Sequence, residues 1–171
     1  YLGTLRNHFS TLGINGVNEM IRNFTDDAED ITTERGEALA LRLLDHVRAK
    51  MVAFQEETGH LYNLEATPAE GTTYRLARID QRDFPKSAVF ANGKGDEVEA
   101  PFYTNSTHLP VNYTDDLFHL LELQDELQTK YTGGTVIHFF LGERVDDPQA
   151  LKMLVKTICQ QHRLPYFTFS P

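Results

Sequence analysis

A short apolar run near the end of the chain strongly restricts the folds that the chain can adopt. The run "TVIHFFLG" occupies residues 135–142, an amphipathic segment begins at Asp147 and Pro148, and the strand-like "YFTFS" follows at 166–170. Two parallel strands need a crossover between them, usually a helix, and buried parallel strands are apolar without a break. This order predicts an α/β fold with mostly parallel strands, right-handed crossover helices and both faces of the apolar strand covered.

The spacing of apolar and turn residues predicts the other elements. Apolar side chains recur every three or four residues over 31–58, which is the pattern of a long amphipathic helix, and Gly59 is placed to end it. We further expect helices over 16–24 and 71–82, a strand over 60–68, a hairpin within 86–101 and a helix that Thr114 caps. With 171 residues, the chain is long enough for one ordinary domain.

Charge and cysteine content exclude several functions. The formal net charge is −9, so no long-range field draws a nucleic-acid backbone to the chain, and we expect no nucleic-acid partner. Cys159 is the only cysteine, which rules out an internal disulfide and a multi-cysteine metal site. The histidines show no metal-ligand spacing, and no apolar run approaches the roughly 20 residues of a membrane span. The sequence thus predicts no metal site and no membrane partner for this chain.

Polar residues collect at two places where a predicted strand gives way to a helix, and parallel sheets bind ligands at the carboxyl ends of their strands. In "YNLEATPAEG", residues 62–71, strand alternation puts Glu65 on the face opposite Leu64. An inward carboxyl group there would suit a general base, whereas the alternative is a solvated face. Glu70, just before the next helix, offers a second carboxyl group, and its alternative role is to complement the helix dipole.

The second polar segment is "YTNSTH" at 103–108, which has neither a strand nor a helix period. Its amide and hydroxyl groups either hold a small polar molecule or satisfy the loop's own backbone. The imidazole of this segment, taken by itself, is better explained as a structural group. The candidate binding residues are Thr104, Asn105, Ser106, Thr107 and His108. From these residues alone, the chain is an α/β piece with a polar site of unknown purpose.

Four longer stretches carry a family resemblance. They are "NLEATPAEGTTYRLARID", "FYTNSTHLPV", "LQTKYTGGTVIHFFLGE" and "LPYFTFSP", and they resemble the class III anaerobic ribonucleoside-triphosphate reductases, which are glycyl radical enzymes. The resemblance covers nearly the whole chain in consistent order and is strongest from Gly59 to Pro171. It implies a ten-stranded α/β barrel built from two half-barrels, of which residues 1–171 form a single fragment from the later half.

The resemblance also implies a function for the two polar segments. Members of the family reduce ribonucleotides to deoxyribonucleotides by glycyl and thiyl radical chemistry, in many cases with formate as the reductant. Glu65 would be the acid and base near the ribose hydroxyls, with Glu70 left open as the alternative carboxyl group. Asn105 and Ser106 would bind substrate or formate, and Thr104, Thr107 and His108 would line the same cavity.

The resemblance implies partners and cofactors that lie beyond this chain. They are a ribonucleoside triphosphate substrate, a glycyl radical installed by an S-adenosylmethionine-dependent activase, a structural zinc ion and a homodimeric, cytoplasmic enzyme. We expect this chain to be an excised piece of the enzyme that is inactive alone. It would lack the N-terminal regulatory domain, the thiyl-cysteine loop, the zinc site and the glycyl radical loop. The alternatives are a non-catalytic module that binds a nucleotide or another small ligand, and a lyase of the glycyl radical superfamily.

Overall fold

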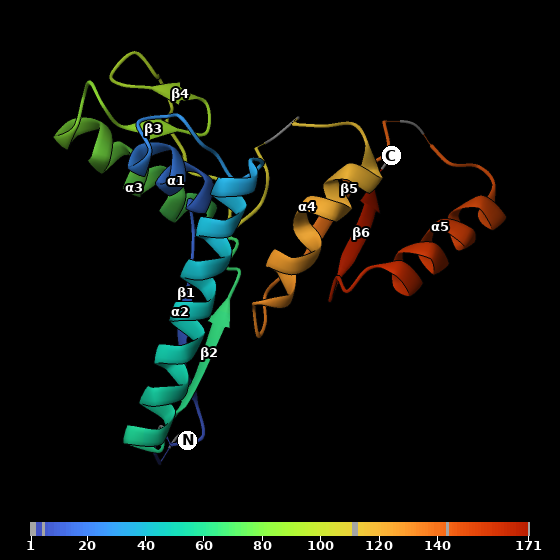
Figure 1. Cartoon of the computed structure of the whole chain (residues 1–171), viewed down its shortest axis with the longest axis horizontal. Helices are drawn as coiled ribbons and strands as arrows, with labels where there is room; N and C mark the ends of the chain where they lie inside the picture. The colour runs from blue at the N-terminus through green and yellow to red at the C-terminus, as the bar shows by residue number, and fades with distance from the viewer. Residues whose placement is uncertain (1–2, 5, 111–112, 143, 171) are drawn as a thin grey trace.

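Two pairs of parallel strands form the frame of the chain (Figure 1). The computed structural model describes residues 3–4, 6–110, 113–142 and 144–170. β1 (Phe9–Gly13) lies parallel to β2 (Leu61–Glu65), and β5 (Ile137–Phe140) lies parallel to β6 (Phe167–Ser170). The predicted α/β fold with parallel strands is therefore confirmed.

Helices join the strands of each pair, because a parallel strand must return to the same end of the sheet before it can pair. The chain runs from β1 to β2 through α1 (Val17–Phe24) and α2 (Glu34–Thr58). It runs from β5 to β6 through α5 (Pro148–Gln161). None of the helices in the described part of the chain is long and apolar enough to cross a membrane.

The elements between the two pairs form a lobe and a linking helix. They are α3 (Glu70–Asp83), β3 (Val89–Phe90), β4 (Gly93–Lys94) and α4 (Leu117–Thr129). β3 and β4 make an antiparallel hairpin, as predicted for residues 86–101. Figure 1 shows the hairpin and α3 beside α1, with α4 leading from this lobe to the second strand pair.

Local signals set several helix ends. Gly59 ends α2 in the left-handed conformation, and the Asp147 carboxylate caps α5 by accepting a hydrogen bond from the Gln149 amide. The predicted Thr114 cap of α4 is wrong. Asp116 is the cap, because its Oδ1 accepts hydrogen bonds from the Phe118 and His119 amides, while the Thr114 hydroxyl accepts one from Asp116 itself.

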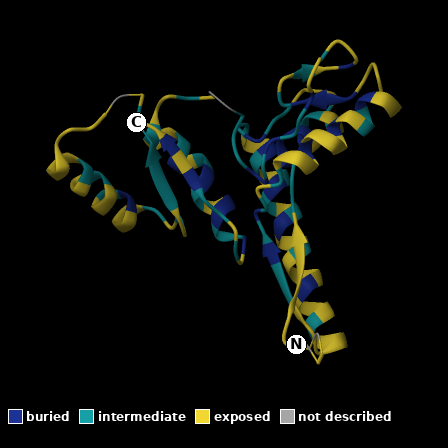
Figure 2. Cartoon of the chain, turned by 180° about the vertical axis from the view of Figure 1, so that it is seen from behind, coloured by how far each residue is buried: buried dark blue, intermediate teal, exposed yellow. Residues whose placement is uncertain are grey.

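Apolar side chains are buried in separate clusters rather than in one core, as the dark segments of Figure 2 show. The first lies between α1, α2, β2 and the end of α4: Val17, Ile21, Ile31, Ala40, Leu44, Met51, Leu64, Ala66, Leu127 and Tyr131. The second lies between β5 and the helices α4 and α5: Leu121, Ile137, Phe139 and Ile158. A small third cluster under the hairpin contains Ala77, Ala88 and Phe90. Because α4 contributes to both larger clusters, it joins the two halves of the chain.

The second strand pair corrects one expectation from the sequence. Side chains of β5 alternate between buried and exposed, so that Ile137 and Phe139 are covered while His138 and Phe140 are not. Phe140 is 79% exposed. The packed face of β5 meets residues of α4 and α5, and within the described residues nothing covers the other face. The prediction that both faces of this apolar strand are covered is thus wrong for this chain.

A short backbone ladder connects the two strand pairs. The Thr132 amide donates to the Leu64 carbonyl at 2.9 Å, and the Ala66 amide donates to the Gly133 carbonyl at 3.2 Å. Glu65 and Gly133 form an isolated parallel bridge. The segment that leads into β5 therefore runs beside the end of β2.

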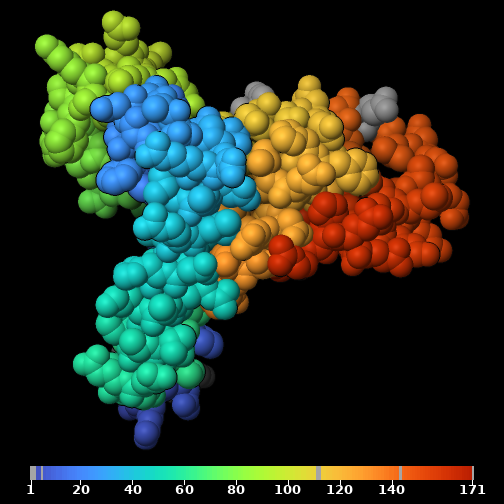
Figure 3. All heavy atoms as spheres, viewed as in Figure 1, coloured from blue at the N-terminus to red at the C-terminus, as the bar shows by residue number. Residues whose placement is uncertain are grey.

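The molecule is open, with three arms that Figure 3 shows as separate masses. Its accessible surface is 11061 Å². A compact monomer of this mass would expose about 8,500 Å². The difference, about 2,500 Å², means that the chain leaves unusually much of its surface uncovered for its size.

Candidate functional site

Polar side chains form a row across the open face of β1 and β2. Leu64 packs into the first cluster on one side of β2, so Asn63 and Glu65 share the opposite face. The Thr11 hydroxyl donates to Asn63 Oδ1 at 2.7 Å, and Asn63 Nδ2 donates to Glu65 Oε1 at 2.8 Å. The predicted position of Glu65, on the face opposite Leu64, is therefore confirmed.

Glu65 lies at the carboxyl end of β2, where three segments meet. Its carbonyl oxygen accepts a hydrogen bond from the Ile14 amide at 3.3 Å, just past the end of β1. Gly133 lies beside its side chain: a Cβ built on Gly133 would stand 3.7 Å from Glu65 Oε1. The carboxyl group is half-buried, which leaves one side of it open to a ligand on this face.

The segment 103–108 lies across the start of α1. The Gly16 amide donates to the Thr104 carbonyl at 2.8 Å, and the Val17 amide donates to the Ser106 carbonyl at 3.1 Å. Ser106 has a φ of 48°, an uncommon conformation for a residue other than glycine, which these contacts hold in place. The loop is therefore fixed by its backbone and not by its side chains alone.

Glu65 and Asn105 flank the same two residues at the end of β1. Ile14 is bonded to Glu65, and the next residue, Asn15, forms an antiparallel bridge with Asn105. The two polar segments that the sequence singled out, more than thirty residues apart, thus meet around one strand end. This is the arrangement expected where neighbouring parallel strands end together.

A pocket of about 300 Å³ opens beside the loop. Its lining consists of Glu70, Thr73, Phe102, Tyr103, Thr104, Asn105, His108 and Leu109. Glu70 begins α3 and thus brings its carboxyl group to the same hollow as Asn105 and His108. Glu65 is not part of this lining, so the structure places the two candidate carboxyl groups in different surroundings.

The three hydroxyl residues of the loop face inward. The Thr104 hydroxyl donates to the carboxyl group of Glu19 at 2.9 Å, although Thr104 also contributes to the pocket wall. Ser106 and Thr107 are almost fully buried, and within the described residues their hydroxyls have no hydrogen-bond partner. Of the five predicted binding residues, Thr104, Asn105 and His108 therefore reach the pocket, while Ser106 and Thr107 lie behind it.

His108 is a titratable group of the pocket whose surroundings differ strongly from water. Burial lowers its pKa to about 4, and electrostatic repulsion from the nearby His138 acts in the same direction. His108 is consequently neutral at pH 7. His138 belongs to the uncovered face of β5, and its Nδ1 lies 2.6 Å from the Thr168 hydroxyl on β6. This neighbourhood brings the second strand pair to the same side of the molecule as the loop.

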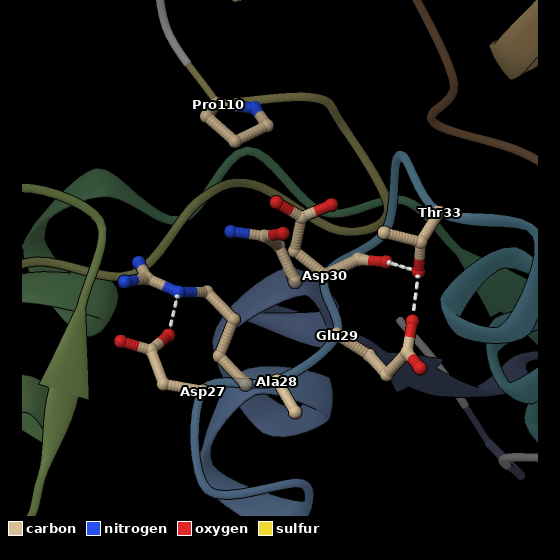
Figure 4. A pocket seen from close by; sticks show the side chains of 8 residues that line it. Asp27, Ala28, Glu29, Asp30, Thr33 and Pro110 are labelled. Atoms are coloured by element: carbon tan, nitrogen blue, oxygen red, sulfur yellow. Dashed lines mark hydrogen bonds and ion pairs between the residues drawn. The ribbon is translucent and has the colours of Figure 1, made fainter.

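A second polar pocket, of about 320 Å³, lies between α1 and the turn that follows it (Figure 4). Its side chains bind one another: Arg22 Nε lies 2.6 Å from Asp27 Oδ1, and the Thr33 hydroxyl donates to Glu29 Oε2 at 2.7 Å. These contacts hold the turn, and the Thr33 hydroxyl also caps α2 by accepting a hydrogen bond from the Gly36 amide at 3.1 Å. In the described parts of the chain, no group of three or more His, Cys, Asp or Glu residues is arranged to hold a metal ion.

Two residues of the site have roles that the sequence did not reveal. Asn63 could be placed on the face of Glu65 by alternation, but the hydrogen bond between them could not be read from spacing. Glu19 gave no signal, since an acidic residue in a first helical turn is ordinarily solvated. Its contact with Thr104 joins positions 85 residues apart.

Comparison with known proteins agrees with this architecture. A family model described as anaerobic ribonucleoside-triphosphate reductase matches residues 2–171. The anaerobic ribonucleoside-triphosphate reductase of Haemophilus influenzae is 25% identical over 158 residues, which are 92% of this chain and 21% of that protein. The chain therefore spans about a fifth of the length of this relative.

Solved structures show the same fold. The anaerobic ribonucleotide reductase from Thermotoga maritima with MES in the active site superposes with a TM-score of 0.77 at 26% identity, over 97% of this chain and 26% of that one. The same enzyme in complex with dATP and CTP gives a TM-score of 0.75 at 25% identity, over 97% and 26%.

The parallel strands, the helical crossovers and these superpositions define an α/β protein with the fold of the anaerobic ribonucleotide reductases. Because the family model matches almost every residue, the chain belongs to the anaerobic ribonucleoside-triphosphate reductase family.

Proposed function

We propose that this chain is a segment of the catalytic barrel of an anaerobic ribonucleoside-triphosphate reductase, from the later half of a ten-stranded α/β barrel. Three observations support the proposal. The chain spans 21% of its Haemophilus influenzae relative, the strands of its two main pairs are parallel, and the open face of β1 and β2 carries the polar side chains of Thr11, Asn63 and Glu65. That face would form part of the inner wall of the barrel.

The proposed catalytic group is Glu65. Reduction of a ribonucleotide removes the 2′-hydroxyl as water, which requires a proton donor, and the 3′-oxygen requires a proton acceptor. A carboxyl group in a water-poor cavity can alternate between these roles. The half-buried position of Glu65 and its hydrogen bond from Asn63 suit a group that must be held in one orientation.

The proposed binding groups belong to the loop. Asn105 and the neutral His108 would hydrogen-bond the substrate or formate from the pocket, Thr104 would contribute to the pocket wall, and Ser106 and Thr107 would shape the loop from behind. The observation that carries the proposal is the meeting of Glu65 and Asn105 on either side of residues 14–15. That arrangement supports a shared site, because it brings a carboxyl group at the end of β2 and the loop residue Asn105 to the two residues that follow β1.

The substrate, reductant and partners are parts of the same proposal. We propose a ribonucleoside triphosphate as substrate and formate as reductant, with a radical-generating activase, a homodimer and a cytoplasmic location for the complete enzyme. A glycyl radical would supply the oxidising equivalent that starts the reaction. The family resemblance implies a structural zinc ion. Among the described residues, no group of three or more His, Cys, Asp or Glu side chains is arranged to bind it.

The test is a pair of carboxyl substitutions in the full-length reductase. Glu65→Gln should lower deoxyribonucleotide formation at least about 100-fold, because the amide can neither give nor take the required proton. The yield of glycyl radical, measured by electron paramagnetic resonance, should be unchanged. Glu70→Gln tests the alternative carboxyl group and should lower turnover less than Glu65→Gln, because its amide can still hydrogen-bond in the pocket. Loss of turnover in Glu70→Gln with normal turnover in Glu65→Gln would transfer the role to Glu70.

A further inference from the structure

Glu19 is a buried carboxyl group to which the proposed chemistry gives no role. It lies in the first turn of α1 and is 0% exposed. None of the ion pairs in the described residues includes it. A carboxyl group is costly to bury unless hydrogen bonds satisfy it, so its position calls for a specific partner.

That partner is the binding loop. Glu19 Oε2 accepts two hydrogen bonds from Thr104, one from the amide at 2.9 Å and one from the hydroxyl at 2.9 Å. Oε1 accepts a hydrogen bond from Asn18 Nδ2 at 2.8 Å. Asn18 is itself fixed, because its Oδ1 accepts a hydrogen bond from the Ile31 amide at 3.2 Å. All donors point at Glu19, which matches the acceptor capacity of a carboxylate.

These contacts fix the backbone on both sides of Asn105. Glu19 and the Gly16 amide hold Thr104 from its side chain, amide and carbonyl, and the Val17 amide holds the Ser106 carbonyl. Asn105 lies between these two anchored residues. Its own side chain is left free to face the pocket of about 300 Å³.

We propose that Glu19 is a positioning residue, which sets the direction of the Asn105 side chain without touching the substrate. This inference rests on the proposed binding role of Asn105. Hydrogen bonds from buried donors to a charged acceptor are stronger than neutral ones, so a carboxylate holds the loop more firmly than an amide would.

The local hydrogen bonds allow a sharp substitution design. In Glu19→Gln, one oxygen becomes an NH₂ group, which must face either Asn18 Nδ2 or the two donors of Thr104. Either choice sets donor against donor. In the double variant Asn18→Asp/Glu19→Gln, the amide of residue 19 donates to the new carboxylate and its oxygen again accepts from Thr104. The carboxylate at position 18 still accepts from the Ile31 amide.

The experiment is a double-mutant cycle in the full-length reductase, with CTP and formate as the probes. Asn105→Ala identifies which of the two KM values depends on Asn105. Glu19→Gln should raise that same KM at least fivefold, leave the glycyl radical yield unchanged, and have less than a twofold effect in the N105A background. Asn18→Asp/Glu19→Gln should restore the KM to within twofold of the wild-type value.

The outcomes separate this proposal from the proposed function. If Asn105→Ala changes neither KM, the binding role of Asn105 fails and the role of Glu19 fails with it. If Asn105→Ala raises a KM but Glu19→Gln does not, only the Glu19 proposal is overturned. An equal effect of Glu19→Gln in both backgrounds would also overturn it. Should Glu19→Gln not fold, Thr104→Val removes one donor to the same oxygen and is used in the same cycle.

Discussion

The amide of Asn63 is oriented from one side by Thr11 and faces Glu65 on the other. The Thr11 hydroxyl donates to Asn63 Oδ1 at 2.7 Å, which leaves Nδ2 to donate to Glu65 Oε1 at 2.8 Å. A short row of three residues on two strands thus determines which way the candidate acid-base group points. The row lies on the uncovered face, so any ligand bound there would meet it directly.

Substitution of Asn63 by Asp should impair catalysis while sparing the fold. Asp removes the donor and sets a second carboxyl group against Glu65, so like charges repel where a hydrogen bond existed. We expect a fall in kcat of at least about tenfold. The measurement is steady-state turnover of the full-length reductase, with the melting temperature as the check on folding.

Thr11→Val is the matched control for that substitution. It keeps the shape of the side chain and removes only the hydroxyl that orients Asn63, so kcat should fall by no more than about threefold. A Thr11→Val enzyme as impaired as Asn63→Asp would show that the strand face, and not the contact with Glu65, is the sensitive feature.

Gly16 is required by the close approach of the loop to α1. Its φ is 70°, and a Cβ at this position would lie 3.0 Å from Cβ of Tyr103. Gly16→Ala should therefore destabilise the protein by about 1–3 kcal/mol. Gly71→Ala is the control, because Gly71 lies in α3 and a Cβ there meets nothing within 4 Å. Thermal melting should show a lower midpoint for the first variant and an unchanged or higher midpoint for the second.

The depressed pKa of His108 predicts loss of stability in mild acid. The folded protein resists protonation of His108 down to about pH 4, whereas the unfolded chain takes up this proton near pH 6.5. The contribution of His108 to the free energy of unfolding is fully present above pH 6.5. It declines as the pH falls towards 4, because over this range only the unfolded state takes up the proton. With allowance for the partial exposure of the ring, we expect a contribution of about 1–2 kcal/mol.

His108→Gln should remove this component of the acid sensitivity. Melting temperatures of the full-length enzyme measured from pH 7 to pH 4.5 should fall less steeply for the variant than for the wild-type enzyme. His60→Gln serves as the control, since His60 is exposed and should leave the slope unchanged. Parallel slopes for the wild-type and His108→Gln enzymes would contradict the assignment.

Local signals in the sequence predicted much of the fold. Asp147 and Pro148 mark the start of α5 through an N-cap and a preset φ, both of which depend on neighbouring residues only. Strand alternation placed Glu65 opposite Leu64 because its period is a property of the extended backbone. The α4 cap was misplaced because Thr114 and Asp116 are both good capping residues, and geometry alone selects between them.

Long-range relations were beyond the sequence. The bonds from Thr104 to Glu19 and the bridge between Asn15 and Asn105 connect segments about ninety residues apart, and no spacing rule applies at that distance. The exposure of Phe140 could not be predicted either. Its neighbours in "TVIHFFLG" are almost all apolar, which is typical of a buried strand. Burial depends on which elements pack nearby, and the residues themselves do not specify that.

The uncovered Phe140 has a practical consequence for anyone who engineers this segment. A surface-directed library would treat a side chain that is 79% exposed as free to vary and would introduce charged residues there. Within the proposed barrel the same position would lie in the enclosed interior, where a charged side chain would lose much of its solvation. Tolerance to substitution at position 140 should therefore follow the rules of an interior residue, despite the solvent around it here.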